Sequence, residues 1–397
     1  MKLLCLCFWT PPQPRPQAIL IGKMIPEWRR QGMEPVLLTY ENHGAWAVDA
    51  PVTTIPVFQR DRLAKLLRVW GNWQERRYRE RIRRIAAQTI RAHGLPLIFS
   101  FANPMESNFL GIALKRELGV PCISHFSDPY ADSPLKEISA RQQRILLARE
   151  REVVAQSDRV VFVNDPLRRL VMGKYPDDWQ AKAVVIPHCY DPALHRTTRP
   201  ANGRFVLSHV GVFYPARHPE RLFQAMAALR AKRPEFEQAF VLRLVGGVNP
   251  YSGFSQERLN ALIAQYGLER MVEILPTVDY QASLDHMADS DGLLALDVDL
   301  PDSPFLPSKL IDYLGARRPI LALTPPDSPT WEVVTRAGGI ALPHHATDRL
   351  VAALEELVFQ HASQNPDDAY VRQFSVASTT ARYRELFAGL LAERGVS

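Results

Sequence analysis

The residues best suited to chemistry in this chain lie in the segment 297–322, DVDLPDSPFLPSKLIDYLGARRPILA. Three prolines keep its first part out of regular structure, because each proline fixes φ and removes a backbone donor. Ser308 is the predicted N-cap of a helix over 309–316. A helix N-terminus offers free N–H groups and the positive end of a dipole, and Lys309 adds a full charge there. The segment therefore predicts a phosphate or diphosphate site, with a capped helix and a solvated lysine as the alternative.

The elements that would position this segment alternate between strand and helix. A polar stretch with two prolines, 192–202, interrupts this pattern, which then starts again. We therefore predict an α/β fold of two doubly wound, Rossmann-like domains that face each other across a cleft. Their expected ranges are 1–195 and 200–375, and a last helix, 376–397, is expected to pack back on the first domain. The predicted strands are 2–8, 34–40, 96–101, 121–125, 159–164, 182–187, 205–210, 240–245, 272–275, 292–296, 319–323 and 338–342.

Composition narrows the class of protein. No apolar run approaches the roughly 20 residues that a membrane-spanning helix needs. The apolar run near the N-terminus has no small-residue cleavage site after it, so we expect a buried strand and not a signal peptide. The four cysteines show no metal-ligand spacing, which predicts reduced core thiols in a cytoplasmic protein. They are Cys5, Cys7, Cys122 and Cys189.

Positive charge is concentrated between residues 60 and 94, where 11 Arg and Lys stand against 3 Asp and Glu. A broken apolar stripe runs through this predicted helical segment. A basic amphipathic helix with Trp at its edge can bind an anionic membrane from the cytoplasmic side. The alternative is a solvated helix whose apolar side packs on the sheet, and nucleic acid is not expected as a partner. The stripe consists of Leu63, Leu66, Leu67, Trp70, Trp73, Tyr78, Ile82 and Ile85.

Three motifs carry a resemblance to a known family. The segment 186–192, IPHCYDP, is similar to an IPNGxDxxxF motif, with His188 and Cys189 in place of Asn and Gly. The segment 242–247, LRLVGG, is similar to LxIVGxG. The segment 307–322 closely resembles PSKxxEYLAxGxPVLA. With the two-domain pattern, these motifs resemble the retaining GT4-like glycosyltransferases of the GT-B fold, over nearly the whole chain.

The resemblance implies a donor site for a UDP- or GDP-sugar in the second domain. Asp312 stands where the family binds the ribose hydroxyls with a Glu, one methylene longer. Backbone groups at Ser308 and Leu310 would contact the diphosphate, and those near Gly246 would contact the base. The family's earlier acid, eight residues before the later one, is replaced by Pro304. Asp299 and Asp302 are candidate substitutes.

The loop that begins at Gly211, GVFYPARHPE, occupies the place of the family's GRxxxxKG diphosphate loop. Val212 replaces its Arg, and Arg217 lies close to the position of its Lys. Negative charge grows on the β-phosphate as the sugar bond breaks, so Arg217 and Lys309 are the predicted catalytic cations. We expect no metal or other cofactor. The alternatives are a surface ion pair between Arg217 and Glu220, and a metal at the D-x-D pair of residues 297 and 299.

The acceptor side is predicted in the loop 124–130, SHFSDPY, which resembles a DFRDPW loop of related sugar transferases. Asp128 could bind the acceptor hydroxyl or act as a base, and His125 is a second candidate. The alternative for Asp128 is a turn cap, since Asp before Pro is common in turns. Retaining GT-B enzymes are thought to use the leaving phosphate as base, so a protein base is not essential.

The resulting hypothesis is a glycosyltransferase that moves a sugar from a nucleotide sugar to a glycan or lipid-linked glycan, with retention. Two other functions stay open. One is a GT-B nucleotide-sugar epimerase, which would be expected to show clear acid and base side chains at strand ends. The other is a non-catalytic binding protein of the same fold, for which Val212, Pro304 and Asp312 are the motivating departures.

Overall fold

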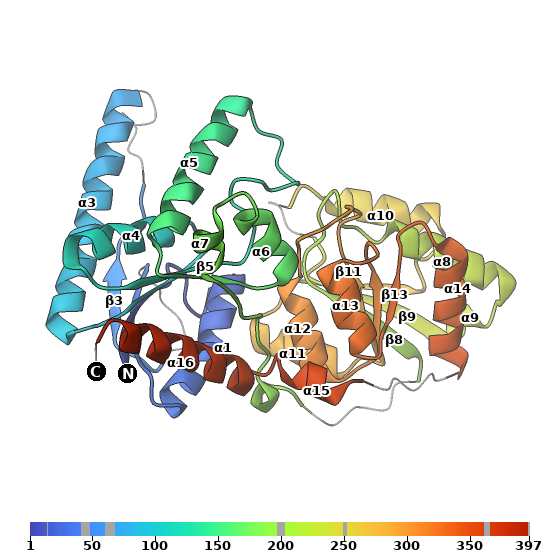
Figure 1. Cartoon of the computed structure of the whole chain (residues 1–397). Helices are drawn as coiled ribbons and strands as arrows, with labels where there is room; N and C mark the ends of the chain where they lie inside the picture. The colour runs from blue at the N-terminus through green and yellow to red at the C-terminus, as the bar shows by residue number, and fades with distance from the viewer. Residues whose placement is uncertain are drawn as a thin grey trace. The chain divides into compact units, whose positions relative to one another are not determined.

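The computed structural model describes residues 1–13, 15–40, 48–59, 68–196, 203–248, 252–360 and 366–395. The chain divides into two compact units. Unit 1 comprises Met1–His188 together with Val376–Ser397, and unit 2 comprises Cys189–Ser375. Each unit is an α/β domain built on a parallel sheet (Figure 1).

The sheet of unit 1 has the strand order β3-β2-β1-β4-β5-β6-β7. All neighbouring strands are parallel, and the order reverses between β1 and β4. The core strands are apolar on both faces, as expected where helices cover both sides. The strands are β1 (Lys2–Leu6), β2 (Glu34–Tyr40), β3 (Val52–Ile55), β4 (Ile98–Phe101), β5 (Cys122–Phe126), β6 (Arg159–Phe162) and β7 (Ala183–Val185).

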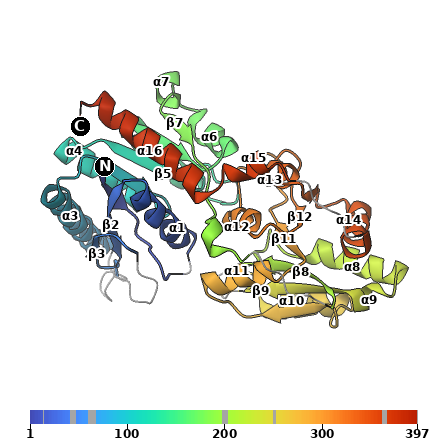
Figure 2. The ribbon, with the colours of Figure 1, turned by 90° about the horizontal axis from the view of Figure 1, so that it is seen from below.

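Helices cover both faces of this sheet (Figures 1 and 2). On one face, α1 places Trp28 against Phe99 of β4 and against Tyr383 and Phe387 of α16. The other face packs against α3, α4 and α5 through one apolar core. The helices are α1 (Pro16–Arg30), α3 (Arg68–His93), α4 (Glu106–Leu118), α5 (Ala140–Gln156), α6 (Asp165–Met172), α7 (Asp177–Gln180) and α16 (Val376–Glu393).

The sheet of unit 2 has the strand order β10-β9-β8-β11-β12-β13, again parallel throughout. Here the order reverses between β8 and β11. In such sheets, ligands bind outside the carboxyl ends of the strands at the point of reversal. The strands are β8 (Phe205–Val210), β9 (Phe240–Val245), β10 (Val272–Leu275), β11 (Gly292–Leu296), β12 (Ile320–Leu323) and β13 (Ile340–Leu342).

Two apolar cores hold the helices of unit 2 on its sheet. One core includes residues of α8, α10 and α14, and the other includes residues of α11, α12, α13 and α15. The helices are α8 (Glu220–Lys232), α9 (Phe236–Ala239), α10 (Gln256–Gln265), α11 (Tyr280–Ala288), α12 (Ser308–Ala316), α13 (Pro329–Arg336), α14 (Thr347–Glu355) and α15 (Asp368–Arg372). A 3-10 turn, η1 (Pro192–Leu194), and a π-helical turn, η2 (Glu356–Gln360), complete the unit.

The predicted fold class is confirmed, since both sheets are parallel and both are wound on two faces. Strand β3 was not predicted; it has four residues and is only partly buried. Helix α5 begins at Ala140, because Ser139 caps it in a capping box with Gln142. All four cysteines are buried, and none of them forms a disulfide. In the ranges that the structure describes, no helix is long and apolar enough to span a membrane.

Candidate active site

The predicted donor residues gather at the reversal point of unit 2. Strands β8 and β11 are parallel neighbours, paired at Leu207–Gly292 and Ser208–Leu293. Their carboxyl ends therefore bring the loop after Val210 and the segment after Leu296 to the same edge of the sheet. Helix α12 follows β11 and begins at this edge with Ser308. Gly211, Arg217, Asp297 and Lys309 meet here, as their contacts below show.

The start of α12 differs from the prediction in one respect. Ser308 is the first helical residue and not the N-cap. Pro307 occupies the cap with φ −58° and ψ 123°, since a proline at this position loses no helical hydrogen bond. The N–H of Leu310 already donates to the Pro307 carbonyl at 2.9 Å. The N–H groups of Ser308 and Lys309 are the first of the helix, where no intrahelical acceptor precedes them.

The side chain of Lys309 lies over Gly211. A Cβ atom placed on Gly211 would come within 2.7 Å of the Lys309 Nζ, and Gly211 has φ +134°. Both facts require glycine at this position. Burial, and then repulsion from Arg217, lower the pKa of Lys309 well below its usual value, although Asp297 opposes this shift. The amine therefore lies where a bound anion would stabilise its charged form.

Arg217 forms its ion pair with Asp297, not with Glu220. Its Nη2 lies 3.6 Å from Asp297 Oδ1, and its side chain is 16% exposed. The alternative of a surface pair with Glu220 is thus wrong; Glu220 instead lies 3.8 Å from His218 Nδ1. The Nε of Arg217 is buried and has no hydrogen-bond partner among the described residues. A guanidinium that is held on one side and unsatisfied on another is suited to an incoming phosphate oxygen.

Asp297 is a fully buried carboxylate that the fold holds by three donors. Val298 N–H donates to Oδ1 at 2.8 Å, and the hydroxyls of Thr324 and Thr330 donate to Oδ2 at 3.2 and 2.7 Å. These bonds fix the carboxylate that faces Arg217. Asp299, the second acid of the D-x-D pair, is exposed. Among the described residues, no group of three or more His, Cys, Asp or Glu side chains could hold a metal ion.

Asp312 and Gly246 flank this centre. Asp312 lies one turn further along α12, only 6% exposed, and its Oδ1 accepts a hydrogen bond from the Tyr280 hydroxyl at 2.9 Å. Burial, and then the charge of Asp312, raise the pKa of that Tyr280 hydroxyl. Gly246 directly follows β9 with φ +67°, and its N–H donates to Leu275 O at 3.1 Å. The predicted ribose ligand, Asp312, is thus a carboxylate that already has a hydrogen-bond partner.

The predicted acceptor residues belong to unit 1, at the carboxyl end of β5. Asp128 is exposed, and its Oδ2 accepts hydrogen bonds from Asn103 Nδ2 at 2.8 Å and from Ser127 Oγ at 3.4 Å. His125 lies within β5 and is 1% exposed. Burial lowers the pKa of His125 to about 4. Of the two candidates, Asp128 is the one that an acceptor can reach.

Two buried side chains at the carboxyl edge of the unit 2 sheet, His209 and Tyr313, were not predicted. The Leu294 carbonyl of β11 lies 3.0 Å from His209 Nδ1 and accepts the Tyr313 hydroxyl at 3.3 Å. The same Tyr313 oxygen accepts the N–H of Val210 at 3.0 Å. These side chains connect β8 and β11 beyond their last paired residues. The sequence signal was present, because His209 is a polar residue inside the apolar strand FVLSHV.

Part of this sequence matches a known family, and the fold matches solved structures. Residues 19–189 match the model of the glycosyl transferase 4-like domain. The D-inositol 3-phosphate glycosyltransferase of Actinosynnema mirum is 26% identical over 181 residues. That match spans 43% of this chain and 43% of the relative, less than half of each.

Solved structures match over the whole chain at low identity. The Anabaena protein HepE in complex with UDP-glucose has a TM-score of 0.70 and 16% identity, covering 98% of this chain and 100% of that one. Sucrose-phosphate synthase from Thermosynechococcus elongatus has a TM-score of 0.69 and 16% identity, with 99% and 100% covered. The chain therefore has the GT-B fold, and the resemblance seen in the sequence is confirmed.

Proposed function

We propose that this chain, a GT-B protein with a glycosyl transferase 4-like domain, transfers a sugar from a nucleotide sugar to a glycan or lipid-linked glycan with retention. The observation that carries the proposal is the placement of Arg217 and Lys309 beside the start of α12, at the reversal point of unit 2. The similar Anabaena structure holds UDP-glucose, which supports a nucleotide-sugar donor.

The proposed chemistry is heterolysis of the bond between the sugar C1 and the β-phosphate oxygen. The electron pair stays on that oxygen, so negative charge develops on the leaving diphosphate. Arg217, Lys309 and the first N–H groups of α12 would stabilise this charge, and we expect no metal to be required. Loss of one such donor typically costs about 10²–10³-fold in rate. The acceptor hydroxyl then attacks C1 from the same face, and its proton passes to the leaving phosphate or to Asp128.

A donor panel tests this proposal. UDP- and GDP-linked sugars are incubated with the wild-type protein and with Arg217→Ala and Lys309→Met, and release of nucleoside diphosphate is followed. We expect each variant to lose about 10²–10³-fold in turnover. Lys232→Met is the matched control, because Lys232 lies at the end of α8, pairs with Glu355 and is 61% exposed. Turnover close to wild type in both site variants would exclude the assigned roles.

Product analysis without an acceptor distinguishes the other functions. A transferase releases free sugar and nucleoside diphosphate slowly under these conditions, whereas an epimerase returns an isomeric nucleotide sugar. A non-catalytic protein gives neither product.

We further propose that the first turns of α3 bind an anionic membrane surface. Val69, Trp70 and Trp73 are 84%, 38% and 44% exposed. The two indole rings stack at 4.6 Å, and the guanidinium of Arg77 lies 4.7 Å from the Trp73 ring centroid. Exposed Trp beside Arg suits the lipid headgroup region. A lipid-linked acceptor would be presented at such a surface.

The rest of α3 packs and forms ion pairs within unit 1. Ile82 is buried in the core, and Tyr78 and Ile85 pack against it. Arg83 pairs with Glu80 and Glu117, which satisfies its charge internally. The packing alternative therefore holds for this half of the predicted stripe. Leu63, Leu66 and Leu67 lie outside the described residues.

Co-sedimentation with anionic vesicles tests the membrane proposal. Trp70→Ala with Trp73→Ala should reduce binding by about tenfold or more, since each loses a large apolar side chain at the interface. Ile145→Ala, an exposed apolar residue of α5, is the control and should bind like wild type. Salt-insensitive binding, or binding that survives the double substitution, would contradict the proposal.

A further inference from the structure

His209 lies at the centre of the proposed donor site and is fully buried within β8. Its Nδ1 is 3.0 Å from the Leu294 carbonyl, which can only accept a hydrogen bond. The Nδ1 atom must therefore carry the proton, and the neutral ring presents a lone pair at Nε2. The Lys309 Nζ lies 3.0 Å from that Nε2. The lysine is thus the donor of this contact.

The ring of His209 is itself fixed in place. It stacks on Phe213 at a centroid distance of 4.8 Å and an interplanar angle of 19°. The N–H of Phe213 in turn donates to the Gly247 carbonyl at 2.7 Å, which ties the loop after β8 to the end of β9. The His209 ring, which accepts the hydrogen bond from Lys309, therefore belongs to a rigid part of the sheet edge.

We infer that His209 is a positioning residue, which uses Nε2 to hold the Lys309 amine over Gly211 for the leaving diphosphate. The inference rests on the proposed function and assigns a role to a residue that the resemblance did not indicate. A lysine side chain has four flexible carbons, so fixing its end in advance reduces the entropy lost when the phosphate binds. A neutral acceptor also orients the amine without cancelling its charge, as a carboxylate would do.

The charged groups around the Lys309 amine make diphosphate binding depend on pH. Arg217 from the loop after β8 and Asp297 from the end of β11 face Lys309, together with His209 itself. Burial, and then the charge of Lys309, lower the pKa of His209. The ring therefore stays neutral, and its Nε2 can accept the hydrogen bond from Lys309. The pKa of Lys309 is lowered as well, mainly by burial. A bound diphosphate must raise it again, so binding takes up a proton at a pH between the pKa of the free protein and that of the complex.

The sign of the pH dependence follows. Below the pKa of Lys309 in the free protein, the amine is already charged and the affinity for UDP is greatest. As the pH rises through that pKa toward the higher value in the complex, each binding event must bring a proton and the affinity falls. Lys309→Met should remove this part of the pH dependence.

Titration calorimetry with UDP tests the inference on the full chain. His209→Gln can place an amide oxygen near the position of Nε2, whereas His209→Asn can only reach Leu294 O. We expect His209→Asn to weaken UDP binding by about tenfold to a hundredfold, and His209→Gln to retain most of the affinity. His209→Asn should also show less proton uptake, measured by repeating the titration in buffers of different ionisation enthalpy. His93→Asn, an exposed histidine at the end of α3, is the control.

The outcomes separate the two proposals. If the wild-type protein binds neither UDP nor GDP, the proposed function fails. If it binds UDP, and His209→Asn and His209→Gln both bind with unchanged affinity and proton uptake, the positioning role fails. If a variant does not fold, ring 15N chemical shifts of the wild-type protein decide the point. Protonated Nδ1 and bare Nε2 at neutral pH support the role, whereas the opposite tautomer or an imidazolium overturns it.

Discussion

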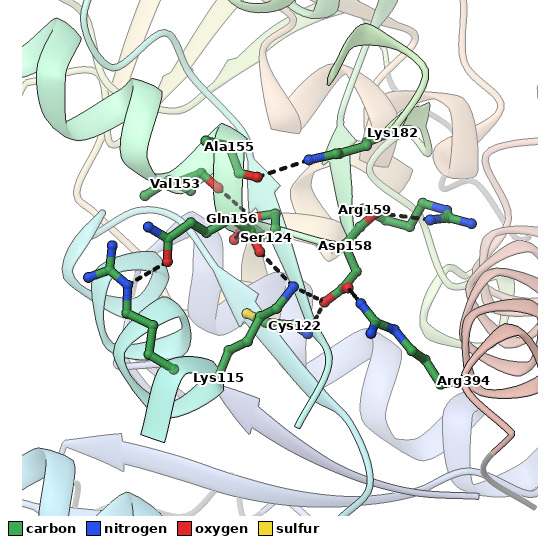
Figure 3. Close-up of polar contacts among 12 residues, drawn as sticks. Lys115, Cys122, Ser124, Val153, Ala155, Gln156, Asp158, Arg159, Lys182 and Arg394 are labelled. Atoms are coloured by element: carbon green, nitrogen blue, oxygen red, sulfur yellow. Dashed lines mark hydrogen bonds and ion pairs between the residues drawn. The ribbon is translucent and has the colours of Figure 1, made fainter. Parts of the chain in front are cut away.

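Replacement of Asp158 is the most informative test of how unit 1 is held together. Asp158 lies directly before β6, and its side chain is 4% exposed. It accepts hydrogen bonds from Lys115 Nζ at 2.6 Å and from Cys122 N–H at 2.8 Å, and it also pairs with Arg394 (Figure 3). One carboxylate thus connects α4, β5 and the end of the C-terminal helix segment to the sheet.

The structure allows the cost of Asp158→Asn to be estimated. The amide can still accept the Cys122 N–H, but it cannot balance two cations. Removing one partner of a fully buried pair costs about 3–5 kcal/mol. Lys115 and Arg394 are 24% and 53% exposed, so water recovers part of this loss. We expect about 2–3 kcal/mol, or about 4–12 °C in the Tm of unit 1.

Thermal unfolding followed by circular dichroism measures this effect. Glu393→Gln is the matched control, because its ion pair with Arg159 also joins α16 to β6 but lies at the surface. Exposed pairs contribute about 0–1 kcal/mol. A loss for Asp158→Asn no larger than that of Glu393→Gln would refute the view that this buried carboxylate anchors the helix.

The same substitution changes the response to acid. Burial alone would raise the pKa of Asp158, but hydrogen bonds from Lys115 and Cys122 N–H, with the charge of Lys115, lower it overall. The stabilisation is therefore complete above the unfolded pKa of about 3.9 and is lost as the pH falls below that value. Asp158→Asn should unfold with a flatter pH dependence below about pH 4.

Three further predictions concern the active site. Gly211→Ala should weaken UDP binding by at least about tenfold, because the added Cβ would displace the Lys309 amine and because Gly211 has a positive φ. Normal affinity by calorimetry would contradict this packing. Asp312→Asn should raise KM for the donor more than it lowers kcat, and an unchanged KM would exclude ribose binding by this residue. Asp128→Asn should lower transfer, but not donor hydrolysis, by about 10²-fold if it serves the acceptor, whereas equal loss in both assays would exclude that role.

The alternation of strands and helices was predictable from the sequence because both sheets are buried on two faces. Their strands are continuous apolar runs, bounded by turns and helices with their own periodicity. The short strand β3 was not predicted because it lies at a sheet edge and only Ile55 of its four residues is buried. Strand order could not be derived from local pattern, and it is the order that places Gly211 and Asp297 side by side.

The placement of Arg217 and Lys309 at the sheet edge of unit 2 was predictable, because the loop and the helix that carry them follow apolar strands. Contacts between residues far apart in the sequence were not predictable. Asp297 was considered only as a metal ligand, although Thr324 and Thr330 turn its carboxylate toward Arg217. His209 and Lys309 are 100 positions apart, so no motif spacing reveals their contact.

A crystal structure with UDP bound is the direct test of the proposed donor site. We expect the β-phosphate within hydrogen-bond distance of the Arg217 guanidinium, of Lys309 Nζ and of the first N–H groups of α12. The Lys309 amine should keep its contact with His209 Nε2 in that complex. A diphosphate bound elsewhere, or one that touches neither Arg217 nor Lys309, would exclude the proposed donor site.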